Sequence, residues 1–233
     1  MSARSLLVAT ALLAGGCVAA PATRVAPPAE EPAAAPSASA APSEPAAESE
    51  RPYEVAASLT TFFLPGEDDI ISPVVQVDAD AIHFEVRYAY EDRDSGSMFA
   101  GANWGMGSEE EGPRVDATIM AGAVGGKAQG VIPAYRLSLS WSFLAASTEG
   151  EYVFGVGDDT SDFFYSWSEA LVAPVDWLYA GVAAQRLKPV DSDKTLDVGP
   201  LLGVAFDAFY VTVYAMNPGG DDDYAVLSVG VTF

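Results

Sequence analysis

The sequence predicts an all-β fold, an up-and-down antiparallel barrel of about 12 strands, from three observations. Apolar and polar residues alternate with a period of two in one segment after another from residue 51 onward. The connections between these segments alternate between longer, mostly acidic loops and tight turns. No stretch has a helical period, and no apolar run reaches the roughly 20 residues of a transmembrane helix.

The chain begins with an export signal at residues 1–17. Arg4 supplies the positive charge, residues 6–14 form an apolar run, and small residues precede the single Cys. The segment Leu13-Ala14-Gly15-Gly16-Cys17 resembles a bacterial lipoprotein signal, although the Leu usually stands where Ala14 is here. The resemblance implies lipidation of Cys17. The alternative is ordinary signal cleavage near residue 19 or 20, which would discard that Cys.

Residues 18–50 are expected to form a disordered tether. They contain 13 Ala and 7 Pro, and most of the others are Ser and Glu, so they cannot build an apolar core. A Pro-rich segment of this kind is a semi-extended spacer. A domain boundary therefore falls near Arg51, and residues 51–233 form the barrel domain.

Twelve segments of the barrel domain are predicted to form strands. The clearest runs from Tyr135 to Phe143, where Tyr135, Leu137, Leu139, Trp141 and Phe143 alternate with Arg and Ser. The expected strands are roughly 53–64, 70–78, 81–91, 97–106, 113–124, 132–142, 145–156, 162–173, 176–187, 194–206, 208–216 and 223–233. In the third segment, Ile82, Phe84, Val86, Tyr88 and Tyr90 are expected to share one apolar face.

The apolar faces are predicted to point outward to lipid. The polar faces carry charged residues between Ser, Thr, Gly and Asn, which suits a wet or ion-paired lumen. Strands of about 9 to 12 residues also suit a tilted crossing of the bilayer. The competing interpretation is a soluble β-sandwich or barrel with these faces turned inward.

The last segment resembles the C-terminal targeting strand of Gram-negative outer-membrane β-barrel proteins. The chain ends on Phe233, and Ala225, Leu227, Val229 and Val231 alternate before it. This resemblance implies a location in the bacterial outer membrane, with the N-terminal tether in the periplasm. The implied partners are outer-membrane lipids and lipopolysaccharide, together with the barrel-insertion machinery.

Composition excludes several classes of function. The net charge is −22, from 33 acidic and 11 basic residues, so the chain cannot assemble the basic surface that nucleic acids need. One Cys and one His leave no Cys-rich or His-rich zinc site and no thiol redox pair. The acidic loops carry no EF-hand spacing, so simple solvation is the expectation, and the alternative is calcium binding by the Asp residues of the 158–162 and 221–223 segments. We expect no enzyme, no cofactor and no dedicated metal site.

His83 is the only histidine of the chain and therefore its one candidate for an imidazole catalytic base. Outer-membrane phospholipases with twelve strands place a Ser two residues after their His, where this chain has Glu85, so the resemblance fails at the nucleophile. We expect His83 to be a lumen residue satisfied by carboxylates or water.

Alternation assigns nine side chains to the lumen, namely His83, Glu85, Arg87, Asp116, Arg136, Glu149, Glu151, Glu169 and Asp197. Because acids outnumber bases in this set, the leading hypothesis is a small, porin-like channel for cations or small polar solutes. The alternative is a structural or adhesive envelope barrel whose lumen is closed by ion pairs.

Aromatic residues gather at Phe163, Phe164, Tyr165 and Trp167, and again at Trp177 and Tyr179. We interpret both groups as the interfacial girdle of a membrane barrel. The alternative is a stacking track for sugars or nucleosides inside a channel.

Overall fold

The computed structural model describes residues 53–108, 112–157, 160–190, 195–206 and 208–233. The predicted export signal, the predicted tether and Cys17 lie outside these residues. Within them, no helix is long and apolar enough to cross a membrane.

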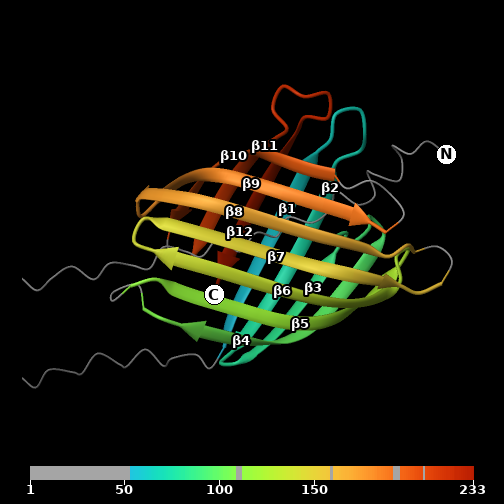
Figure 1. Cartoon of the computed structure of the whole chain (residues 1–233), viewed down its shortest axis with the longest axis horizontal. Helices are drawn as coiled ribbons and strands as arrows, with labels where there is room; N and C mark the ends of the chain where they lie inside the picture. The colour runs from blue at the N-terminus through green and yellow to red at the C-terminus, as the bar shows by residue number, and fades with distance from the viewer. Residues whose placement is uncertain (1–52, 109–111, 158–159, 191–194, 207) are drawn as a thin grey trace, which may run out of the picture.

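Twelve antiparallel strands form a closed barrel, as the sequence predicts (Figure 1). Each strand pairs with its neighbours in chain order, and β1 closes the barrel against β12. The strands are β1 (Glu54–Phe63), β2 (Ile70–Ala79), β3 (Ile82–Tyr88), β4 (Ser95–Met106), β5 (Arg114–Gly126), β6 (Gly130–Trp141), β7 (Leu144–Gly155), β8 (Phe163–Val175), β9 (Leu178–Pro189), β10 (Thr195–Phe206), β11 (Phe209–Met216) and β12 (Tyr224–Thr232).

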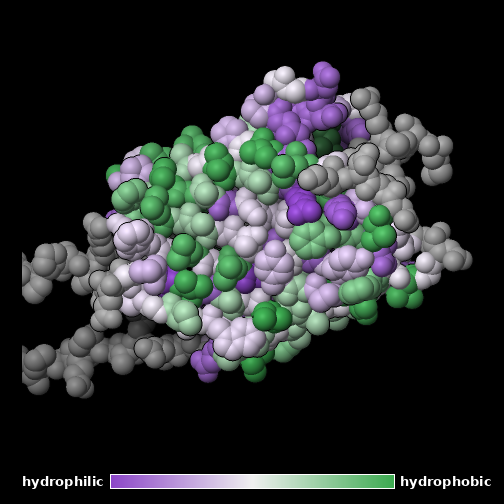
Figure 2. All heavy atoms as spheres, viewed as in Figure 1, coloured by the Kyte–Doolittle hydropathy of each residue, from purple (hydrophilic) through white to green (hydrophobic). Residues whose placement is uncertain are grey.

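The barrel has two unlike ends. The connections that follow odd-numbered strands lie at one end, which we call the loop end, and most of them are longer and acidic. The connections that follow even-numbered strands lie at the other end, the turn end, together with Tyr53 and the C-terminal Phe233. The 107–113 connection is the long exception at the turn end. In Figure 2, strongly hydrophilic residues gather at the top, over the 64–69 and 217–223 loops, and hydrophobic residues are spread over the strands below.

The outer wall is apolar because the strands keep their two-residue period, apart from an irregularity between Val172 and Val175 at the end of β8. In β3, His83, Glu85 and Arg87 are buried inside, and the residues between them are about half exposed outside. Acidic side chains are absent from the outward faces of all twelve strands, although the chain contains 33 Asp and Glu.

Exposed aromatic side chains ring the outer wall at both ends. The ring at the turn end consists of Trp104, Trp141, Phe143, Trp177, Phe206, Phe209 and Phe233. The ring at the loop end includes Phe63, Tyr88 and Phe154, together with the half-buried Phe164. Two aromatic girdles on either side of an apolar band are typical of barrels that span a membrane.

Tightly packed side chains fill the lumen toward the loop end. Every strand contributes an inward side chain that is buried, among them Phe62, Val74, Arg87, Phe99, Val124, Ile132, Val153, Tyr165, Leu187, Leu201, Tyr214 and Val226. A continuous water path would leave such side chains accessible. The lumen is therefore closed in this half of the barrel.

The expected outward position of Tyr90 is wrong. β3 ends at Tyr88, and Ala89 takes a positive φ of 49°, which turns the chain and breaks the alternation. Ala89, Tyr90 and Glu91 then enter the lumen, where each is at most 4% exposed. The amide of Ala89 donates to the carbonyl of Ser95 at 2.8 Å, which closes this inward turn.

The interpretation of both aromatic groups as a girdle is also wrong for most of their members. Phe163, Tyr165, Trp167 and Tyr179 point inward and are buried, because they occupy the odd positions of β8 and β9. Trp167 packs edge-on against Tyr214, with ring centroids 5.3 Å apart, so it presents no free face for stacking a sugar.

Candidate functional site in the lumen

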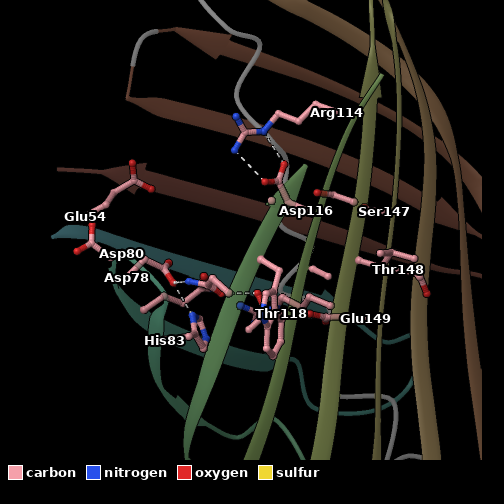
Figure 3. A pocket seen from close by; sticks show the side chains of 18 of the residues that line it. Glu54, Asp78, Asp80, His83, Arg114, Asp116, Thr118, Ser147, Thr148 and Glu149 are labelled. Atoms are coloured by element: carbon pink, nitrogen blue, oxygen red, sulfur yellow. Dashed lines mark hydrogen bonds and ion pairs between the residues drawn. The ribbon is translucent and has the colours of Figure 1, made fainter. Parts of the chain in front are cut away.

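A cavity of about 750 Å³ occupies the lumen at the turn end. We call it the vestibule. Its lining includes Tyr53, Glu54, Asp80 and Phe233, so it extends to the rim where the chain enters and leaves the barrel. Figure 3 shows polar side chains from β1, β2 and β3 on one side of this space and from β5 and β7 on the other.

One wall of the vestibule is acidic. Glu54 and Asp80 are exposed at its rim. Deeper in, one Asp78 oxygen, Oδ1, lies 2.7 Å from His83 Nδ1 and accepts a bond of 2.6 Å from Asn103 Nδ2. Thr118 donates to Asn103 Oδ1 at 2.6 Å, which fixes the orientation of the amide. Asp78 is thereby held in place by neighbours on β3 and β4.

The opposite wall pairs its charges. Arg114 donates from Nε and Nη2 to the two oxygens of Asp116, at 2.7 and 2.8 Å. This parallel arrangement is the geometry that guanidinium and carboxylate groups favour. Ser138 and Ser147 supply hydroxyl groups beside the pair. This wall is polar, but close to neutral.

Ion pairs between charged side chains form the floor of the vestibule. We call Glu85, Arg87, Arg136, Glu149 and Glu151 the ion-pair cluster. Glu85 pairs with both guanidinium groups, and Arg136 Nε also lies 3.2 Å from a Glu149 oxygen. Arg87 reaches across to Glu151 at 2.9 Å. Arg136 and Glu149 line the vestibule, whereas Glu85, Arg87 and Glu151 lie beneath them.

Residues of the β3–β4 connection pack directly against the cluster. The Tyr90 hydroxyl donates to Glu149, and the Arg87 guanidinium carbon lies 4.0 Å from the centroid of the Tyr90 ring. Glu91 is buried beside Arg87, and burial raises the pKa of its carboxyl above the usual range. Because Glu91 keeps its proton to a higher pH than an exposed Glu, its carboxyl can be neutral inside the lumen.

His83 is positioned by carboxylates on both sides. Its Nδ1 pairs with Asp78, and its Nε2 lies 3.6 Å from Glu85. Carboxylates orient an imidazole, but they are not the hydroxyl nucleophile that ester hydrolysis would need. Among the described residues, no group of three or more His, Cys, Asp or Glu side chains is placed to hold a metal ion.

The structure places all nine predicted lumen residues on inward faces, but it does not bring all nine together. Five of them form the ion-pair cluster, with His83 beside it, and Asp116 stands on the vestibule wall. Glu169 is separate, where it accepts from Trp167 at 2.7 Å and from Tyr214 at 2.8 Å. Asp197 lies nearer the loop end, bonded to Asn217 and Tyr224.

Sequence reasoning missed several residues of the site. Asp78, Asn103 and Arg114 occupy inward positions of β2, β4 and β5, so the same alternation could have found them. Tyr90 could not be found in this way, because the left-handed Ala89 before it breaks the pattern, whereas Glu91 keeps the parity of Glu85 and Arg87.

Comparison with known proteins supports the fold alone. No family model matches the chain, and no curated protein matches it. Among solved structures, the chain is similar to the KdgM porin, with 10% identity and a TM-score of 0.49 over 76% of this chain and 98% of that one. The KdgM porin in complex with disordered oligogalacturonate has 10% identity and a TM-score of 0.50, over 77% of this chain and 98% of that one. The outer membrane protein Omp33 of Acinetobacter baumannii has 11% identity and a TM-score of 0.40, over 78% of this chain and 96% of that one.

Proposed function

We propose that the protein is a bacterial outer-membrane β-barrel, with its turn end toward the periplasm. The observation that carries this proposal is the outer wall, which is apolar, free of acids and bounded by two aromatic girdles. Barrels of this membrane have short periplasmic turns and longer outer loops, which sets the direction of insertion. The tether and a lipidated Cys17 would then lie on the periplasmic side.

We further propose that the lumen serves as a small channel and that the conformation described here is its closed state. The vestibule gives a small polar solute room to enter from the turn end. Passage to the other side requires the β3–β4 connection, with Tyr90 and Glu91, to leave the lumen. This connection lies outside the strands, so it can move without breaking the barrel's hydrogen-bond ladder.

Cations and neutral polar solutes are the class that the vestibule favours. Glu54, Asp78 and Asp80 make one wall acidic, and the opposite wall offsets only its own charge. Acidic side chains in a narrow lumen attract cations and repel anions. An acidic sugar chain, such as the oligogalacturonate in the complex with the KdgM porin, is therefore not among the solutes that we expect this vestibule to admit.

The second candidate is an envelope barrel that never opens. The specific observation in its favour is that each of the twelve strands contributes a buried inward side chain. In this interpretation the ion-pair cluster is a structural core, and the vestibule is only the unfilled end of the barrel.

Replacement of Tyr90 by Ala tests the channel against the closed barrel. The substitution removes a ring that is 1% exposed in the lumen and its hydrogen bond to Glu149, which keeps its ion pair with Arg136. In planar bilayers, Y90A is expected to conduct more often than the wild type, and Y90F, which keeps the ring, far less so. Y88A is the matched control, because Tyr88 is 53% exposed on the outer wall. Silent recordings from all four proteins, each correctly folded and inserted, would favour the permanently closed barrel.

A further inference from the structure

Two basic residues interrupt the apolar outer wall. Arg186 and Lys188 are the only charged side chains that point outward from the twelve strands. They stand two residues apart on β9, so they share one face, and both are exposed. In a chain with 33 acidic and 11 basic residues, an outward pair of cations without an acid between them calls for an explanation.

The pair lies at the level of the aromatic girdle of the loop end. Lys188 is the register partner of Phe164, and Arg186 is the register partner of Ser166. The Arg186 guanidinium carbon lies 5.8 Å from the centroid of the Phe164 ring. A charge on the lipid face is costly at the bilayer centre and tolerated at the interface, toward which long basic side chains extend their charged heads. The guanidinium group of Arg186 and the ammonium group of Lys188 are therefore expected to lie among the lipid headgroups.

The described part of the barrel provides no anion for them. Within the described residues, the salt bridges involve His83, Arg87, Arg114, Lys127 and Arg136, and none involves Arg186 or Lys188. The wall of a second copy would not provide one either, because the outward strand faces contain no Asp or Glu. The described residues thus leave the complementary anion to the surroundings of the wall, which are lipid at the proposed location.

We propose that Arg186 and Lys188, with Ser166 beside them, bind a phosphate group of a glycolipid in the outer leaflet. This proposal rests on the outer-membrane location proposed above, with the loop end outward. A guanidinium group can donate two parallel N–H bonds to phosphate oxygens, while the ammonium group adds a point charge and the Ser hydroxyl a third donor. The phosphorylated glycolipid of this leaflet is the lipid A part of lipopolysaccharide.

Native mass spectrometry of the full chain in detergent can measure this binding. The probes are bisphosphorylated lipid A, the same glycolipid without its phosphates, and phosphatidylglycerol. We expect the wild type to prefer lipid A, and R186Q/K188Q to bind it about tenfold more weakly, since two charge-assisted contacts are lost. The matched control is R93Q/K127Q, which removes one Arg and one Lys from loops at the same end. R186K/K188R keeps both charges and should retain binding.

Four outcomes would overturn the proposal. They are equal binding of lipid A and its dephosphorylated form, equal binding of lipid A and phosphatidylglycerol, an equal loss in the control variant, and a protein dimer that disappears in R186Q/K188Q. Heat-modified mobility in gels verifies that each variant is folded. Insertion of the wild type into bilayers is recorded separately. Failure to insert would count against the proposed function, whereas normal insertion with no preference for lipid A would count against this site alone.

Discussion

Arg87 and Glu151 form an ion pair across the lumen, with Arg87 Nη1 2.9 Å from Glu151 Oε2. The two residues are 64 positions apart in sequence, and both side chains are at most 3% exposed. Arg87 also faces the rings of Tyr90 and Phe99, at 4.0 and 4.3 Å from their centroids. This single guanidinium therefore connects β3, β4, β7 and the β3–β4 connection.

Removal of both partners of this pair should destabilise the barrel by less than the sum of the two single removals. Arg87→Met leaves Glu151 buried with its principal cation gone, and such losses cost about 3–5 kcal/mol. The double variant R87M/E151M leaves no orphaned charge at that point, so its cost should fall below the sum of the single costs. Urea unfolding of liposome-inserted protein measures all three free energies. Strictly additive values would show that the pair is not coupled.

The β3–β4 connection should become easier to release as pH rises. Burial raises the pKa of Glu91, so the closed state holds a proton that an exposed Glu91 would have lost. Between the ordinary Glu range and the raised value, the closed state binds more protons than the released state. Its stability therefore falls with increasing pH.

Hydrogen exchange of the Ala89 amide, corrected for the intrinsic pH dependence of exchange, reports this release. The amide is protected by its bond to Ser95, and E91Q should remove most of the pH dependence. Glu85, Arg87 and Glu151 also face Glu91 and remain unchanged in that variant. E54Q, at the opposite end of the barrel, is the control. An unaltered pH profile in E91Q would assign the effect to another group.

Phe233 should matter more for assembly than for stability. Its amide donates to Val55 at 2.8 Å, but its ring is 62% exposed on the outer wall, so F233A should change the free energy of unfolding by less than about 1 kcal/mol. Because the last strand resembles a targeting signal, the amount of assembled barrel in cells should nevertheless drop several-fold. F206A, which removes another exposed ring at the turn end, is the control. Equal yields of F233A and wild type would remove the support that this resemblance gives.

Cys17 should carry a lipid that the barrel does not need for insertion. C17S is expected to lose incorporation of labelled fatty acid and to remain in the outer membrane, since the apolar wall and its girdles hold the barrel there. Metabolic labelling followed by membrane fractionation measures both properties. A mature N-terminus at Val18 or beyond in the wild type would contradict lipidation.

The fold could be predicted from sequence because a strand in a closed barrel has one environment on each face. Wherever a segment kept its period of two, as at His83-Phe84-Glu85-Val86-Arg87, the inward and outward sides followed directly. The pairing of strands in chain order then followed from the short connections.

The closure of the lumen could not be predicted in the same way. It depends on the left-handed turn at Ala89, which local alternation does not encode, and on contacts such as Arg136 with Glu85, 51 positions apart. The inward aromatic residues Tyr165 and Trp167 were misassigned because composition alone does not say which face a ring occupies. Sequence thus indicates which side chains enter a barrel, but not whether they fill it.

The reversal potential of Y90A in a planar bilayer under a KCl gradient tests the central claim most directly, because it requires a membrane-spanning barrel, an open lumen and an acidic vestibule at once. We expect a potential of the sign set by cation flow, which moves toward zero at high salt as the vestibule charges are screened. An anion-selective potential, or no conductance from folded and inserted protein, would contradict it.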